Sequence, residues 1–163
     1  MAQKQSDDKW VLVEPKKFFI SFKDQSGHDC AVHLYEFLKE RNVDVFISDR
    51  DLQYDMTQGQ WREQIDRALT ATKVFILIIT VTASTSSEVI REIEQVIDRD
   101  DVGKFIFINE PLWNDENQTT IQLANGGQVN LKAFQAATFE NRFELVRKVY
   151  SSVPIIARIE FEE

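Results

Sequence analysis

Lys73-Val-Phe-Ile-Leu-Ile-Ile-Thr80 is the stretch that decides the fold, and a serine-rich turn and the segment Glu88-Val-Ile-Arg-Glu92-Ile follow it. An unbroken apolar run of this length is typical of a parallel strand that is buried on both faces. The serines after it are typical of the start of a helix. Open α/β sheets place their chemistry at the carboxyl ends of their strands, and Glu92 follows such an end. Glu92 is therefore the first candidate for a catalytic residue.

Four short runs rich in β-forming residues recur along the chain, and a segment with helical periodicity separates each run from the next. This βαβαβαβ alternation predicts an α/β fold, in which a parallel sheet carries helices on both faces. The four predicted strands are residues 17–22, 43–47, 74–80 and 104–109.

The predicted helices follow from apolar stripes at helical spacing. Three of them span about 30–41, with Asn42 as a stop, 61–69 and 89–97. A fifth strand is expected at about 129–131, residues 110–128 are expected to be mostly loop, and 155–161 are expected to add an edge strand or a tail. A fourth helix is expected to hold Phe139, Phe143, Val146, Val149 and Tyr150.

Length and composition limit the classes of function. The 163 residues predict one main domain over 16–153, with an N-terminal extension at 1–15 and a tail or edge strand at 154–163. A net charge of −8 without a cluster of lysines and arginines disfavours nucleic acid as a partner. A single cysteine, Cys30, excludes an intramolecular disulfide and fits a reducing compartment. Since no apolar run approaches a membrane-spanning length, we expect a soluble cytoplasmic protein without a membrane partner.

Glu92 lies just outside the apolar stripe of its predicted helix, nearest Val96. That place would leave its carboxylate partly desolvated at the edge of the sheet. Partial burial raises the pKa of a carboxyl group and strengthens the attraction of its ionised form for a developing cation. The alternative is a surface glutamate beside a core helix. Glu88 is better explained as the capping-box partner of Thr85.

Two predicted loops lie at the same edge of the sheet. Residues 21–27, Ser-Phe-Lys-Asp-Gln-Ser-Gly, precede a helix and could hold a phosphate. The alternative is a simple turn without a binding role, in which Ser26 caps the helix. Residues 48–59 make a connection about twice the usual length between a strand and a helix. Such long connections often bind ligands or partners, and the alternative is a solvated loop.

Several other kinds of chemistry are disfavoured. His28 and His33 are five positions apart and have no further ligand at metal-binding spacing, so we expect no metal site. No Gly-x-Ser-x-Gly elbow of a serine hydrolase occurs. A phosphorelay receiver would need paired acidic residues after the first strand, where this chain has Ser21, Phe22 and Lys23.

Together these segments resemble a Toll/interleukin-1 receptor (TIR) domain of the prokaryotic type. Phe19-Ile-Ser-Phe22 is similar to the first-strand box of that family. Val45-Phe-Ile47, the long connection and the segment 59–69 are similar to the second strand, the BB loop and the helix that follows. The run to Thr80 and the segment 86–93 are similar to the third strand and its Ser-x-Trp-x-x-x-Glu segment. The resemblance covers about residues 17–150.

The resemblance implies a flavodoxin-like three-layer fold with a five-stranded parallel sheet. In many prokaryotic members it also implies cleavage of NAD⁺ at the nicotinamide–ribose bond, with NAD⁺ as a substrate and with no cofactor. Glu92 aligns with the catalytic glutamate of these enzymes. By the same alignment Phe22, Lys23, Ser48 and Gln53 would line the nucleotide pocket. The product would be ADP-ribose or a cyclic isomer of it, made for antiviral defence signalling, and the active form would be an oligomer.

This chain departs from the family pattern at two positions. Glu88 replaces the tryptophan common four residues before the catalytic glutamate, which removes a stacking surface and adds a like charge near the site. Ser48 replaces the usual acidic residue at the end of the second strand. Two alternatives therefore stay open: a non-catalytic module that associates with other TIR domains, and a nucleoside-processing N-glycosidase with a similar sheet and glutamate.

Overall fold

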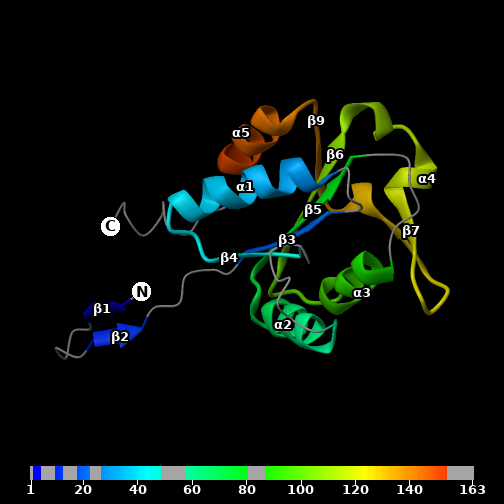
Figure 1. Cartoon of the computed structure of the whole chain (residues 1–163). Helices are drawn as coiled ribbons and strands as arrows, with labels where there is room; N and C mark the ends of the chain where they lie inside the picture. The colour runs from blue at the N-terminus through cyan, green and yellow to red at the C-terminus, as the bar shows by residue number, and fades with distance from the viewer. Residues whose placement is uncertain are drawn as a thin grey trace.

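The computed structural model describes residues 2–4, 10–12, 18–22, 27–48, 58–80 and 87–153. Its main sheet has five parallel strands in the order β4-β3-β5-β6-β9. In Figure 1, helices α1 and α5 cover one face of this sheet, and α2 and α3 cover the other. The strands are β3 (Phe18–Phe22), β4 (Val45–Ile47), β5 (Val74–Ile79), β6 (Gly103–Asn109) and β9 (Gln135–Phe139), and the helices are α1 (His28–Glu40), α2 (Gln58–Ala71), α3 (Ser87–Val96) and α5 (Arg142–Ser152). The predicted three-layer α/β fold with a five-stranded parallel sheet is confirmed.

Smaller elements complete the described chain. Strands β1 (Ala2–Lys4) and β2 (Trp10–Leu12) pair with each other in the antiparallel sense. Between β6 and β9 lie η3 (Glu110–Leu112), α4 (Glu116–Thr119), β7 (Thr120–Gln122), β8 (Gln128–Asn130) and η4 (Leu131–Ala133). The segment expected at 155–161 lies outside the described residues. No helix in the described part of the chain is both long and apolar enough to cross a membrane.

The fifth strand of the main sheet is not where the sequence predicts it. Residues 128–130 form β8, which pairs with β7 in an antiparallel hairpin around Gly126 at φ +90°. The fifth strand is β9, whose sequence Gln-Ala-Ala-Thr-Phe carries no apolar run. Because β9 lies at the edge of the sheet and buries fully only Phe139, it lacks the apolar pattern that marks the inner strands.

The last predicted helix is present as α5, but its predicted stripe is right only in part, because Val146 and Val149 are buried on it and the three aromatic residues are not. Phe139 ends β9, and α5 starts only after Asn141, whose side chain accepts hydrogen bonds from the backbone N–H groups of residues 143 and 144. This cap satisfies the first free N–H groups of the helix and fixes where it begins. On α5, Phe143 and Tyr150 are 63% and 39% exposed. The buried side chains are Leu145, Val146 and Val149.

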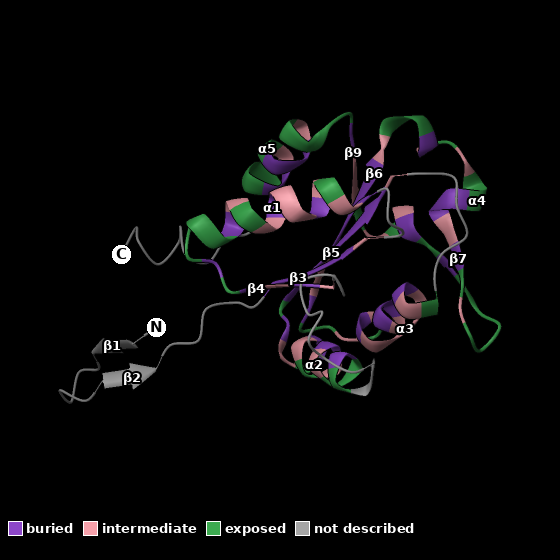
Figure 2. Cartoon of the chain, viewed as in Figure 1, coloured by how far each residue is buried: buried purple, intermediate pink, exposed green. Residues whose placement is uncertain are grey.

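The other predicted stripes are confirmed. Asn42 follows α1 with φ 60°, a left-handed conformation that asparagine tolerates and that stops a helix. The buried side chains are Ala31, Leu34 and Leu38 on α1, Trp61, Ile65 and Leu69 on α2, and Val89, Ile93 and Val96 on α3. Figure 2 shows that the buried residues lie along the strands and on the helix sides that face them.

A row of three phenylalanine rings crosses the first three strands of the sheet. Phe19 on β3 pairs in register with Phe46 on β4 and with Phe75 on β5. Its ring stacks on both, at centroid distances of 5.3 Å and 5.8 Å. Since side chains alternate between the faces of a strand, all three rings point toward α2 and α3. The next residues on that face, two positions later, are Ser21 and Ser48.

Phe19→Ala removes the central ring of this row, which is fully buried, so we expect it to cost about 3–5 kcal/mol of the free energy of unfolding. Phe143→Ala makes the same chemical change at a 63% exposed site and should stay within about 0.5 kcal/mol of the wild type. Urea denaturation monitored by circular dichroism measures both. Equal losses for the two variants would contradict the described burial of Phe19.

Candidate active site

The sheet brings two serine hydroxyls together at the carboxyl ends of neighbouring strands. β3 and β4 pair in parallel with Phe19 opposite Phe46 and Ile20 opposite Ile47. The backbone N–H of Ser48 donates to the carbonyl of Ile20 at 3.0 Å, which carries this register one residue beyond β4. Ser21 and Ser48 therefore lie side by side on the face that α2 and α3 cover.

Helix α3 places a carboxylate over these two hydroxyls. Val89, Ile93 and Val96 anchor the helix in the core, and Glu92 lies on the same side with 1% of its surface exposed. The hydroxyl of Ser21 donates to Oε1 of Glu92 at 2.6 Å. That of Ser48 donates to Oε2 at 2.5 Å. Each carboxylate oxygen thus accepts a hydrogen bond from a different strand.

The electrostatics of this carboxyl group follow from its burial. Desolvation is the largest effect on the pKa of Glu92 and raises it to about 7. The hydrogen bonds from Ser21 and Ser48 lower the pKa and offset part of this rise. The charge of Glu88 adds to the rise, and that of Arg91 opposes it. The group therefore changes its charge near neutral pH, as a catalytic carboxyl group often does.

A network of charged residues joins α2 to α3 beside Glu92. Arg62 donates to Oε1 of Glu88 at 2.5 Å, and Nε of Arg91 lies 3.8 Å from the other oxygen of Glu88. Arg91 also pairs with Asp66 of α2, which in addition accepts a hydrogen bond from Gln95 at 3.0 Å. The structure thus pairs Glu88 with arginines, whereas its predicted capping partner Thr85 lies outside the described residues.

The structure joins some of the predicted site residues and separates others. Ser48 contacts Glu92. Phe22 ends β3 on the opposite face, where it packs with the α1 side of the core and its ring lies edge-on to His28 at 6.0 Å. Lys23 and Gln53 lie outside the described residues. A role for Phe22, Lys23 and Gln53 in nucleotide binding therefore stays a prediction.

Ser21 is the partner of Glu92 that sequence reasoning missed. The sequence gives half of the signal, because Ser21 lies two residues after Phe19 and hence on the same face of the strand. The other half, its place beside Ser48, follows only from the register of β3 and β4. The burial of Glu92 is also deeper than the partial desolvation predicted for it, and the surface alternative is excluded.

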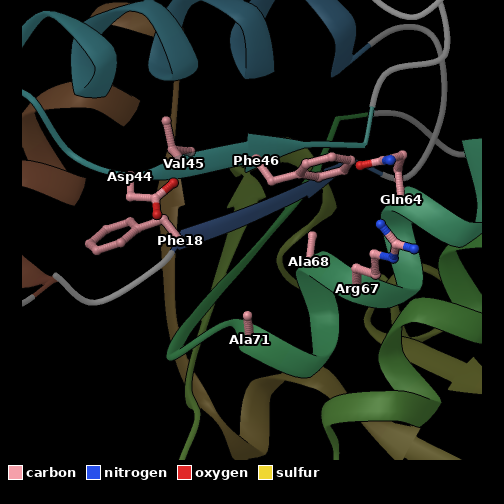
Figure 3. A pocket seen from close by; sticks show the side chains of 8 residues that line it. All are labelled: Phe18, Asp44, Val45, Phe46, Gln64, Arg67, Ala68 and Ala71. Atoms are coloured by element: carbon pink, nitrogen blue, oxygen red, sulfur yellow. The ribbon is translucent and has the colours of Figure 1, made fainter. Parts of the chain in front are cut away.

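Two hollows in the described structure lie apart from Glu92. One of about 260 Å³ opens between β4 and α2 and is shown in Figure 3. It is lined by Phe18, Asp44, Val45, Phe46, Gln64, Arg67, Ala68 and Ala71. The other, of about 410 Å³, is lined by polar residues of α4, β7, β8 and η4. Within the ranges that the structure describes, no group of three or more His, Cys, Asp or Glu side chains could hold a metal ion.

The raised pKa of Glu92 makes stability depend on pH. The folded state keeps the proton up to about pH 7, whereas the unfolded chain releases it near 4.5, so the contribution of Glu92 to stability is full below pH 4.5 and is lost as the pH rises to 7. Glu92→Gln has no such loss. Between pH 4 and pH 8 its free energy of unfolding should therefore gain up to about 3 kcal/mol relative to wild type.

Chemical denaturation at a series of pH values tests this expectation. Glu36→Gln, at an exposed site on α1, is the control for the loss of a carboxylate. A difference between Glu92→Gln and wild type that stays constant from pH 4 to pH 8 would show that the pKa of Glu92 is not raised by folding.

Comparison with known proteins places this site in a family. No curated protein matches the chain. The family model of the TIR domain matches residues 18–145, from the start of β3 into α5. That range spans most of the chain and includes Ser21, Ser48 and Glu92. The chain belongs to the TIR domain family.

Proposed function

We propose that this TIR domain, which we take to span residues 16–153, is an NAD⁺ nucleosidase with Glu92 as its catalytic residue. The observation that supports the proposal is a buried carboxyl group, at the carboxyl end of a parallel sheet, that accepts two hydroxyl hydrogen bonds and titrates near pH 7. The family match adds to this, since the TIR family includes enzymes that cleave NAD⁺.

The reaction breaks the bond between ribose C1′ and the nicotinamide nitrogen. Nicotinamide leaves as a neutral molecule with the bonding electron pair, and positive charge develops on the ribose as an oxocarbenium ion. A carboxylate in a site of low dielectric stabilises such a charge far more than one in water does. The ionised form of Glu92 is therefore the active one. Water attack at C1′ then gives ADP-ribose and a proton, whereas attack by an adenine or ribose atom of the same nucleotide gives a cyclic isomer.

The two serine bonds indicate how the carboxylate would meet the sugar. The nicotinamide ribose carries two neighbouring hydroxyl groups, and Glu92 already accepts bonds from two neighbouring hydroxyl groups. Substrate binding would exchange serine donors for ribose donors without leaving either carboxylate oxygen unpaired, an exchange that keeps the cost of burying the charge low. Ser48 is the less buried of the two serines and is the donor we expect to move first.

We extend the proposal to the nucleotide-binding residues, the cellular location and the partners of the domain. Phe22, Lys23, Ser48 and Gln53 would contact the nucleotide. The domain would act in the cytoplasm, in prokaryotic antiviral defence, and would associate with further copies of itself or with other TIR domains.

One observation favours a second function, that of a non-catalytic TIR interaction module. Glu92 is 1% exposed, and both of its oxygens are already bonded within the protein. A carboxyl group in that state can serve to hold α3 on the sheet. As a non-catalytic module, the domain would act only through association with other TIR domains.

The decisive experiment measures nicotinamide release from NAD⁺ by concentrated protein, with chromatographic separation of the nucleotide products. We expect wild type to turn over NAD⁺ and Glu92→Ala to lose at least about 100-fold of that activity, because the main stabilising charge is gone. Glu36→Ala, at an exposed position on α1, is the matched control and should keep full activity. Absence of turnover in wild type would favour the interaction module. Equal turnover in Glu92→Ala would show that Glu92 is not the catalytic residue.

The pH profile supplies a separate prediction. Since the ionised carboxylate is the active form, kcat/KM should rise with pH and level off above about pH 7. Steady-state rates from pH 5 to pH 9 measure this. A profile that falls through pH 7 would mean that the protonated carboxyl group does the chemistry.

A further inference from the structure

The charges on the facing sides of α2 and α3 have an order that fits only one alignment of the two helices. Along α2, Arg62 is followed one turn later by Asp66; along α3, Glu88 is followed one turn later by Arg91. In the structure Arg62 pairs with Glu88, and Asp66 pairs with Arg91. Each positive charge thus meets a negative one, and the two pairs follow each other in the same direction along both helices.

A shift of α3 by one turn, about 5.4 Å, would reverse this pattern. In one direction Arg91 would meet Arg62, and in the other Glu88 would meet Asp66. Buried apolar side chains recur at each turn of both helices, Trp61, Ile65 and Leu69 on α2 and Val89, Ile93 and Val96 on α3, so a one-turn shift would still place apolar side chains in the core. Like-charge contacts in alternative alignments are a recognised source of specificity in helix pairing.

The alignment matters because Glu92 tolerates little displacement. Its two bonds, at 2.6 Å and 2.5 Å, reach serines on two different strands. Movement of α3 along its axis by a fraction of a turn would break both, since hydrogen bonds weaken steeply beyond about 3.2 Å. Asp66 keeps the negative charge that its pair with Arg91 needs. Partial burial raises the pKa of Asp66, but the hydrogen bonds from Gln95 and Arg91 lower it further, so the pKa stays below its ordinary value and the group stays ionised.

We propose that Arg62, Asp66, Glu88 and Arg91 are positioning residues, which set the axial position of α3 on α2 and thereby hold Glu92 against Ser21 and Ser48. As a statement about catalysis this rests on the proposed function, but the positioning itself does not need NAD⁺ to be tested. It also gives Glu88, which stands where the family usually has tryptophan, a role as the α3 partner of Arg62.

The test asks whether Ser48 still reaches Glu92 when the charge order is disturbed. The titration midpoint of the Glu92 carboxyl group is followed by ¹³C NMR, with and without Ser48→Ala, in four backgrounds. These are wild type, Arg62→Glu, the charge-swapped variant Arg62→Glu/Asp66→Arg/Glu88→Arg/Arg91→Glu, in which both pairs are exchanged so that only the native alignment matches opposite charges, and Arg67→Glu. The last is the matched control, because Arg67 lies on the same helix, is 70% exposed at its side chain and pairs only with Glu63 of its own helix among the described ion pairs.

In wild type, Ser48→Ala should raise the midpoint, because a hydrogen bond to the charged form is lost. In Arg62→Glu most of this upward shift should disappear, since α3 no longer presents Glu92 to Ser48. The shift should return in the charge-swapped variant and be intact in Arg67→Glu. Long-range effects of the changed charges cancel, because each comparison is made within one background.

An upward shift of the same size in all four backgrounds would overturn the proposal. Loss of the shift in the charge-swapped variant as well as in Arg62→Glu would also overturn it, because it would tie the effect to the residues and not to their charge order. Thermal unfolding of each variant shows that it is folded at the temperature of the titration. Nicotinamide release is measured in parallel, so that loss of the proposed enzymatic function is seen separately from loss of positioning.

Discussion

The parallel pairing of β3 with β4 and β5 is the constraint on which the rest of the structure depends. It aligns three phenylalanines across the sheet and, two residues later, brings two serine hydroxyls to the carboxyl ends of adjacent strands. A slip of one residue in β4 would turn Ser48 to the α1 side and Phe46 with it, which would remove both a core ring and a partner of Glu92. The packing of the core and the geometry of the site are therefore specified by the same register.

Burial of the Glu92 carboxyl group has a cost in stability. A fully buried carboxyl group disfavours its own ionised form, and two serine bonds offset only part of that penalty. An aliphatic residue at this position would pack α3 on the sheet without any such penalty. A buried titratable group at the carboxyl edge of the sheet is what the proposed chemistry would require.

Much of the fold could be predicted from the sequence, because buried parallel strands and amphipathic helices leave strong patterns. The inner strands and the stripes of α1, α2 and α3 are where those patterns place them. The sequence does not predict β9, because an edge strand with one buried residue has no apolar run, and it predicts Phe139 in a helix, because the spacing of Phe139 to Phe143 imitates a helical stripe. At the site, Glu92 followed from its position after β5, but its contact with Ser21 depends on tertiary register, which no local pattern encodes.

Folding places Glu92 in the core, bonded to two strands, with a pKa near neutrality. The most direct measurement is the titration of its carboxyl carbon by ¹³C NMR in the wild-type protein, with the resonance assigned by its absence in Glu92→Gln. The account predicts a single midpoint at about pH 7. A midpoint near 4.5, the ordinary value for a glutamate in water, would contradict it, because it would mean that the carboxylate is solvated and not held in the core.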